Sequence, residues 1–358
     1  MLRTPGVALR GNSDGTTFLG CTPKQRMDLS AREFSEVCGD GFVLAAEAQR
    51  VSGLRFESFD LALSIREATE VEEQGRSASF TGGHVVEDNS FHDGISFQIV
   101  LDADSTVRVR RNAFRNVWHA VAIGGRNIHV TENDIAVPEP ERVPFGFAGV
   151  AIGIRPLGDD GACSSMVVAG NRIDGHTEAV AIAVFPQDPP GAECSHITIR
   201  DNEIVIRRVR RPDGSDQAGR LAIAPAIRLY NAQRLVGEGL ITWGEDGMPE
   251  GGWPAALSDG RISDVSVVGN HITGAVGVAI EAAHVTDSRI VDNEVEVRPA
   301  TTAEERDGLS VGGNVSPGVW VLLGLVDEVN GTPVWVSTGI ERTVVRLPSR
   351  KESGEDQN

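Results

Sequence analysis

The sequence predicts an all-β protein in which short parallel strands repeat coil by coil around one core. Three observations predict it: a strand–turn–strand pattern recurs from Glu87 to Val321, an Asn marks the same turn in each copy, and no long amphipathic helix interrupts the pattern. The stretch Val107–Ile154 shows the pattern most clearly, reading VRVRRNAF, VAIGG, IHVTENDI and GVAIGI. Self-similarity of this kind predicts stacked coils rather than a sandwich or a doubly wound sheet.

The turn Asn forms a column when the repeats are aligned. Its members are Asn89, Asn112, Asn133, Asn171, Asn202, Asn270 and Asn293. An apolar column follows two positions later: Phe91, Phe114, Ile135, Ile173, Ile204, Ile272 and Val295. The shortest spacings, 21 and 23 residues, hold three short strands and tight turns. We therefore expect triangular coils about 4.8 Å apart, with Asn side chains hydrogen-bonded from coil to coil.

This pattern resembles the right-handed parallel β-helix family, which includes the pectate lyases and other polysaccharide-active proteins. The resemblance covers about Val51 to Val321. It implies one domain over residues 1–348, with irregular coils in residues 1–50 and a short disordered acidic tail, Ser349–Asn358. The chain enters directly into a strand, which leaves open whether a capping segment precedes it. The fold hosts lyases, hydrolases, epimerases, tailspikes and adhesins, so it does not fix the function.

The composition of the chain argues against two classes of binding partner. The net charge of −18 and the pI near 4.9 argue against duplex nucleic acid and anionic membranes, which both need a basic face. The chain has no apolar run long enough for a transmembrane helix, and its start lacks the apolar core of a signal peptide.

The four cysteines form two plausible pairs. Cys163 and Cys194 each precede their turn Asn by eight residues, so we expect them to stack one coil apart, within reach of a disulfide. Cys21 and Cys38 could pair across a short helix predicted within Asp28–Val37. Two disulfides favour an extracellular or cell-surface protein; reduced thiols in a cytoplasmic protein are the alternative.

By resemblance, the strand carrying the V-x-I motif lines the functional groove. Long segments flank that strand: Ala136–Phe147, Pro156–Ser164, Pro186–Ser195, Arg207–Ala222, Asn231–Asp259 and Arg298–Ser316. Long loops on a rigid scaffold often bind ligands, although they can also cover the sheet or contact another subunit. Whether Asn231–Asp259 is a loop or an extra coil stays open.

Period-two alternation predicts the outward residues of the V-x-I strands. One predicted column is Ser64, Ser96, Ala122, Ala151, Ala181, Arg228, Ala279 and Trp320, and the next is Arg66, Gln98, Gly124, Gly153, Ala183, Tyr230, Glu281 and Leu322. A third column holds Arg126, Arg155 and Phe185. The middle coils would thus present a bare Ala/Gly floor rimmed by arginines. Such a floor suits a saccharide chain, or the packing face of a homotrimer.

Arginines on this face could bind the carboxylate or sulfate groups of an acidic glycan. In the lyase branch of the family an Arg removes the proton α to the carboxyl, commonly beside Ca²⁺, and here only Arg155 and Arg228 lie on the corresponding strand. No metal site or cofactor is identified in the sequence, because the strands lack a compact set of Asp; Ca²⁺ rests on the resemblance alone. The eight His residues are expected at the surface or in turns.

A hydrolase would need two carboxylates roughly 5–10 Å apart. Glu281 is one candidate, with Asp159, Asp160, Asp188 or Glu245 as its partner, unless Glu281 only forms an ion pair with Arg228. Trp243 and Trp253 could stack on sugar rings or pack their own segment.

The leading hypothesis is an extracellular protein that binds and cleaves an acidic polysaccharide, as a lyase or a hydrolase. Its catalytic candidates are Arg228, Glu281 and Tyr230. Its substrate-binding candidates are Arg126, Arg155, Gln98, Phe185, Asp159, Asp160, Trp243 and Trp253. The alternative is a non-catalytic adhesion protein, or a trimer assembled through the Ala/Gly face.

Overall fold

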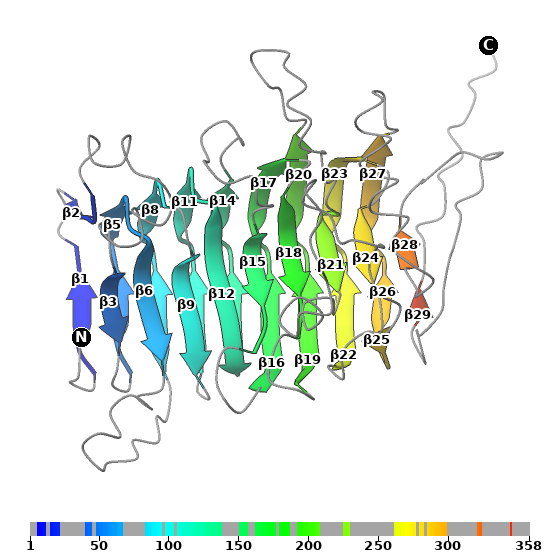
Figure 1. Cartoon of the computed structure of the whole chain (residues 1–358), viewed down its shortest axis with the longest axis horizontal. Helices are drawn as coiled ribbons and strands as arrows, with labels where there is room; N and C mark the ends of the chain where they lie inside the picture. Colours follow the sequence, from blue (N-terminus) through cyan, green and yellow to red (C-terminus); the bar gives the residue numbers. More distant parts are fainter. Residues whose placement is uncertain are drawn as a thin grey trace, which may run out of the picture.

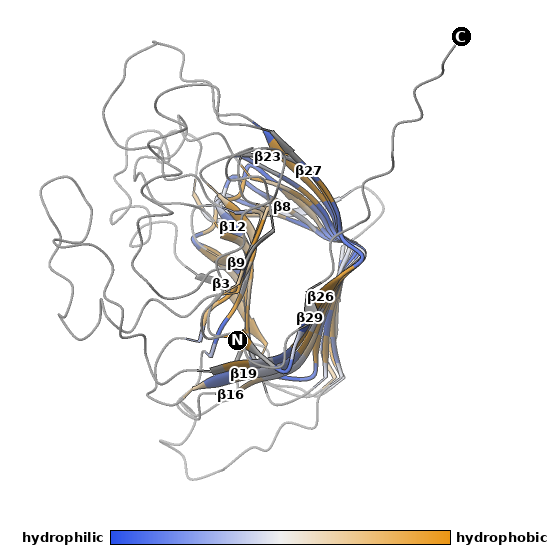
Figure 2. Ribbon diagram, turned by 90° about the vertical axis from the view of Figure 1, so that its right-hand side faces the viewer, coloured by the Kyte–Doolittle hydropathy of each residue, from blue (hydrophilic) through white to orange (hydrophobic). Residues whose placement is uncertain are grey.

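The computed structural model is a parallel β-helix whose strands succeed one another along a single axis (Figure 1). The structure describes residues 6–11, 15–21, 40–44, 48–66, 83–94, 97–103, 106–137, 150–156, 162–176, 179–186, 192–207, 225–229, 261–276, 279–282, 285–298, 321–323 and 344–345. Viewed along the axis, the strands superimpose into three sides around the interior (Figure 2). The predicted fold class is confirmed.

One coil runs through the three sides in order, as β10, β11 and β12 do. The first side consists of β1 (Ala8–Arg10), β4 (Arg50–Ser52), β7 (His84–Glu87), β10 (Val107–Arg110), β13 (Ile128–Thr131), β16 (Ala162–Ala169), β19 (Glu193–Arg200), β22 (Arg261–Val268), β25 (Val285–Thr286), β26 (Arg289–Val291) and β29 (Val344–Val345). The second side consists of β2 (Thr16–Leu19), β5 (Leu54–Glu57), β8 (Ser90–His92), β11 (Ala113–Arg115), β14 (Asp134–Ala136), β17 (Arg172–His176), β20 (Glu203–Arg207), β23 (His271–Val276) and β27 (Glu294–Arg298). The third side consists of β3 (Asp40–Leu44), β6 (Leu61–Arg66), β9 (Phe97–Ala103), β12 (His119–Arg126), β15 (Val150–Ile154), β18 (Val180–Val184), β21 (Ile227–Leu229), β24 (Ile280–Ala282) and β28 (Val321–Leu323).

The core is a stack of equivalent apolar side chains, one from each coil. Phe56, Phe91 and Phe114 stack nearly parallel, with ring centroids 5.0 and 4.8 Å apart, and none is exposed. Ile135 and Ile173 continue the same column in the next coils. Parallel, in-register coils place like residues one strand spacing apart, so one apolar position in the repeat generates a continuous core. The predicted apolar column is confirmed.

The turn between the first and second sides carries the predicted Asn ladder. The Asn112 side-chain amide donates to Asn133 Oδ1 at 3.0 Å and to the Val86 carbonyl at 3.0 Å, and the Asn112 backbone N–H donates to the same Oδ1 at 3.0 Å. The pattern recurs from Asn89 to Asn293, and these Asn residues are at most 3% exposed. The residue before each Asn has a left-handed backbone or is Gly, which turns the chain sharply.

A buried carboxylate lies beside this ladder on the first side. The Glu87 side chain is not exposed, and it accepts hydrogen bonds from Arg110 Nε at 2.7 Å and Arg111 Nη2 at 2.8 Å. Arg50, from the preceding coil, is a third ion-pair partner. Three guanidinium groups therefore compensate the charge of one buried carboxylate.

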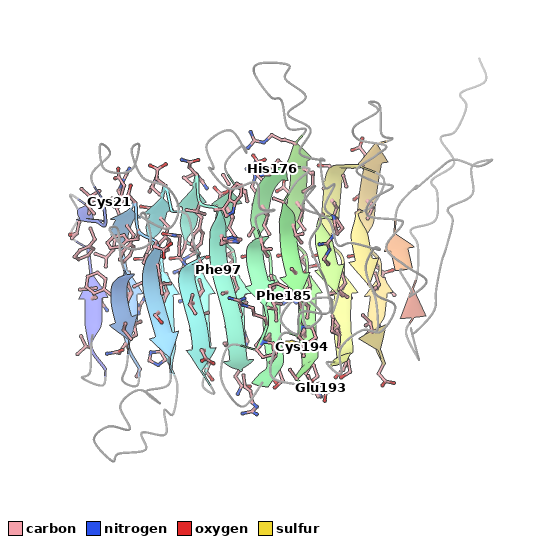
Figure 3. The ribbon with its side chains drawn as sticks, viewed as in Figure 1. Cys21, Phe97, His176, Phe185, Glu193 and Cys194 are labelled. Atoms are coloured by element: carbon pink, nitrogen blue, oxygen red, sulfur yellow. A yellow bond between two sulfur atoms is a disulfide. The ribbon has the colours of Figure 1, made fainter. Side chains whose placement is uncertain are left out.

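A disulfide joins Cys163 in β16 to Cys194 in β19, with Cα atoms 4.5 Å apart and both side chains buried. The register opposes these two cysteines directly, as their equal distance from the turn Asn predicts. Cys21, labelled in Figure 3, is also disulfide-bonded. Its predicted partner Cys38 and the predicted helix within 28–37 lie outside the described residues.

Two features of the C-terminal coils bear on the predictions. β19 pairs directly with β22, and β21 with β24, so no extra coil separates these neighbours. The predicted last V-x-I strand does pair with β24, but β28 runs antiparallel to it, so the prediction of a further parallel coil is wrong there. The predicted tail 349–358 lies outside the described residues, and the single-domain boundary stays a prediction. In the part of the chain described, no helix could cross a membrane.

Candidate functional site

The outer face of the third side holds the candidate site. Its central outward row, followed strand by strand, is Val43, Ser64, Val100, Ala122, Gly153, Ala183, Arg228 and Glu281. The middle of this row consists of small residues, and its C-terminal end brings a guanidinium-bearing residue opposite a carboxylate-bearing one. Arg228 is partly exposed, and Glu281 is placed here by its backbone position alone.

The predicted columns are wrong in register. Arg228 lies opposite Ala183 rather than Ala181, and Glu281 lies opposite Arg228 rather than Tyr230. Between β12 and β15, Ala122 lies opposite Gly153. The offset in these pairings is two residues, which does not change the alternation along a strand, so the hydrophobic pattern of the sequence cannot detect it.

The Ala/Gly floor is not bare. Ala122 is 0% and Ala183 2% exposed, so larger groups cover these small residues. The other predicted floor residues, Ala151, Ala181 and Ala279, belong to the core cluster instead. Alternation fails where the chain enters β18, because the backbone N–H groups of Ala181 and Ile182 both donate to the Ala226 carbonyl, at 2.9 and 3.0 Å.

Two aromatic rings, Phe97 and Phe185 (labelled in Figure 3), and one guanidinium lie over the middle of the floor. Arg155 Cζ is 5.5 Å from the ring centroid of Phe97 and 5.8 Å from that of Phe185. A Cβ built on Gly153 would lie 3.3 Å from Phe97 Cζ and 3.4 Å from Phe185 Cζ, so both rings meet above this glycine. Phe185 also packs with Val150, Val180 and Ala183 in an apolar cluster separate from the core. Burial lowers the pKa of Arg155, which remains charged.

His119, at the start of β12, adjoins this group. Its ring centroid is 4.5 Å from that of Phe97, and its Nδ1 lies 3.1 Å from the Val150 backbone nitrogen and 3.2 Å from the Val150 carbonyl oxygen. Burial lowers the pKa of His119 to about 4, with a further contribution from the nearby charge of Arg155. The imidazole is therefore neutral at pH 7.

Two further predicted binding residues lie away from this group. Arg126 is exposed at the end of β12, opposite Ser164 of the first side, and does not share a row with Arg155. Gln98 is 1% exposed, and its amide donates to the carbonyls of Phe59 (3.3 Å) and Asp60 (3.1 Å). Those bonds anchor the chain before β6, so the geometry gives Gln98 a structural role.

The remaining candidates lie outside the described residues: Tyr230, Asp159, Asp160, Asp188, Trp243, Glu245 and Trp253. Within the described ranges, no group of three or more His, Cys, Asp or Glu could hold a metal ion. Ca²⁺ therefore stays an expectation from the family resemblance alone.

Sequence reasoning missed Phe97 and His119. Their signal was the aromatic residue at the start of two successive V-x-I strands, which lie opposite each other in the ladder. The expectation that every His lies at the surface or in a turn is also wrong, because His84 is 2% and His176 3% exposed. His84 begins β7 and His176 ends β17, so each of these buried rings lies at the end of a strand.

No protein-family model matches the chain, and a search of curated proteins finds no match either. Among solved structures, the chain is similar to the A-module of a mannuronan C-5 epimerase from Azotobacter vinelandii, with 9% identity, a TM-score of 0.36, and coverage of 87% of this chain and 77% of that one. It is also similar to the tailspike of E. coli bacteriophage HK620 in complex with a pentasaccharide, with 11% identity, a TM-score of 0.36, and coverage of 82% and 57%. A third is an alginate lyase, with 13% identity, a TM-score of 0.28, and coverage of 83% and 61%.

The chain thus spans little more than half the length of the tailspike. Likenesses this distant assign no activity to it. The protein is a parallel β-helix, and neither the family models nor these structures place it in a narrower family.

Proposed function

We propose that the outer face of the third side binds an acidic polysaccharide and cleaves it. The observation that carries the proposal is the outward row Gly153–Ala183–Arg228–Glu281, in which small residues lead directly to a guanidinium and a carboxylate on adjacent strands. Arg155 and Phe185 flank this row. Positive groups, an aromatic surface and an acid–base candidate thus occupy one rigid sheet, where a scaffold positions binding groups well.

The arginines on this face favour an anionic ligand, although the net charge of the chain is −18. At physiological ionic strength, charges more than about 8 Å away are largely screened, so contacts with local arginines decide the sign of the interaction. Arginine also fits carboxylates bidentately, which lysine cannot do. The ligand would lie on the layer formed by Phe97, Arg155 and Phe185, since the small residues beneath it are covered.

Two reactions fit the row. In a lyase, Arg228 would remove the proton α to a uronate carboxyl, the role that the family resemblance gives to an Arg on this strand. In a hydrolase, Glu281 would be one of two carboxylates, and its partner would come from Asp159, Asp160, Asp188 or Glu245. Tyr230, next to β21 in sequence, completes the proposed catalytic set, and Trp243 and Trp253 remain proposed sugar-stacking residues.

The alternative of trimer assembly through the Ala/Gly face loses its main support. Ala122 and Ala183 are buried within a single chain, so they offer no surface to a second copy. Non-catalytic binding of a glycan at the same face remains the competing function.

A panel assay tests the proposal. The protein is incubated with acidic polysaccharides (polygalacturonate, alginate, hyaluronan, chondroitin sulfate) and neutral ones (starch, galactan), while unsaturated-product absorbance and new reducing ends are followed together. Absorbance with new ends indicates a lyase, and ends alone a hydrolase. Binding without either indicates a non-catalytic binder, and neither binding nor turnover across the panel would refute the proposal.

A further inference from the structure

Four side chains form a group that the proposed reaction does not use. Phe97 in β9, His119 in β12, and Arg155 and Phe185 directly after β15 and β18 come from four successive coils; we call them the aromatic clamp. Arg155 and Phe185 are neighbours in the ladder, since the Phe185 N–H donates to the Ile154 carbonyl at 3.0 Å. The Phe97 ring, which belongs to a strand two coils away, lies above Gly153 and contacts the same guanidinium.

The clamp holds a guanidinium in a defined position. Its Cζ lies within 6 Å of two phenyl centroids, the distance at which a cation is attracted to a ring face. An exposed Arg would lose considerable rotamer freedom on binding a ligand, whereas Arg155 has been ordered by folding. Its partial burial also strengthens attraction to an anion, because less water screens the pair.

Gly153 makes this arrangement possible. The two rings lie so close above it that an added Cβ would be in tight contact with both at 3.3 and 3.4 Å. Its neighbours in the row, Ala122 and Ala183, are also small and buried. The small floor therefore serves to seat the rings that hold Arg155.

His119 packs against the same group. Its ring centroid is 4.5 Å from that of Phe97, and its Nδ1 contacts the Val150 backbone. The ring therefore supports Phe97 from the neighbouring coil, and because it is neutral at pH 7 it adds no second charge beside Arg155.

We propose that the aromatic clamp is a subsite for one carboxylate group of the polysaccharide, in which Arg155 determines the selectivity for charged over neutral chains, Phe97 and Phe185 position Arg155, and His119 packs against Phe97. This inference rests on the proposed function, since it assigns a subsite of the same face. It assigns recognition of the ligand carboxylate to Arg155 and the cleavage reaction to Arg228 or Glu281.

The test measures the affinity ratio for a charged and a neutral form of the same polymer. Each acidic glycan that binds the wild-type protein is compared with its carboxyl-reduced form by isothermal titration calorimetry. The variants are Arg155→Gln, Arg155→Lys, Phe97→Leu and Phe185→Leu, with Arg108→Gln as the matched control, an exposed arginine on the first side. Thermal unfolding checks that each variant is folded.

We expect Arg155→Gln to weaken binding of the charged form about ten- to hundredfold while leaving the neutral form unchanged. Arg155→Lys should restore part of this loss, because it keeps the charge without the planar fork. Each Phe→Leu variant should lose about three- to tenfold on the charged form only. A structural role alone would not change the charged-to-neutral ratio.

The outcomes separate the two proposals. If the wild-type protein binds no acidic glycan of the panel, the proposed function fails and the clamp proposal fails with it. If it binds one but the affinity ratio is the same in Arg155→Gln and Arg108→Gln, the clamp proposal alone is overturned. Should Arg155→Gln not fold, the ratios for Phe97→Leu and Phe185→Leu decide, since both keep the charge.

Discussion

Arg228 lies directly opposite Glu281, on adjacent parallel strands of the third side. Neighbouring parallel strands are about 4.8 Å apart, so a ligand that crosses both strands would span these two positions. The proposed reaction depends on this pairing of strands.

Replacing the reacting member of this pair should impair cleavage and leave the fold intact. We expect Arg228→Ala, for a lyase, or Glu281→Gln, for a hydrolase, to lower kcat/KM by at least about a hundredfold, the loss typical of a removed acid–base group. Turnover of the polysaccharide identified by the panel measures this, and Arg108→Ala serves as the control. Full activity in Arg228→Ala would remove Arg228 from the reaction.

The fold was predictable because every coil has the same hydrogen-bonding requirement at one of its turns. Each turn needs an amide that both donates and accepts, so Asn133 and its equivalents recur and reveal the coil length. Cys163 and Cys194 could be paired for the same reason, since each has a fixed distance from its Asn. Local rules repeated at every coil leave a visible sequence pattern.

The site was less predictable, because it depends on the register between neighbouring strands and on which side chains cover the small residues. Two-residue shifts between β12 and β15 and between β18 and β21 change which residues meet without changing the alternation along a strand, and the second shift places Arg228 beside Ala183 rather than Ala181. Burial of Ala122 depends on side chains from other coils, which no single repeat encodes. The contact between Phe97 and Arg155 joins strands two coils apart, and no sequence spacing announces it.

The Asn ladder should be the most sensitive structural feature. Asn133 Oδ1 accepts from the backbone and side chain of Asn112, and its amide donates to Val109 and Asn171. Asn133→Ala leaves several buried groups without partners, so we expect a loss of about 2–4 kcal/mol in the free energy of unfolding. Urea unfolding measures it. Arg108→Ala, at an exposed strand position, should change stability by less than about 0.5 kcal/mol.

The disulfide should stabilise the middle coils. It closes a loop with a sequence separation of 31 residues, for which chain entropy predicts about 3–4 kcal/mol. We expect the double variant Cys163→Ala/Cys194→Ala to lose stability of that order in chemical unfolding without reductant. Thiol titration of the denatured wild-type protein should detect no free thiol before reduction and four afterwards, matching the four cysteines. Two reactive thiols before reduction that disappear in the Cys163→Ala/Cys194→Ala variant would contradict the bond between Cys163 and Cys194.

His119 should make the protein sensitive to mild acid. Burial lowers its pKa to about 4, with Arg155 adding to the effect, against 6.5 for an ordinary histidine. As pH falls below 6.5, the unfolded chain takes up a proton that the folded protein refuses, so stability falls from pH 6.5 to about 4 and this contribution is constant below that. The shift corresponds to at most about 3 kcal/mol. Urea unfolding at pH 7 and pH 4.5 should show this loss in the wild-type protein and in the exposed control His196→Gln, but a smaller one in His119→Gln. Equal losses in all three proteins would show that His119 titrates normally in the folded state.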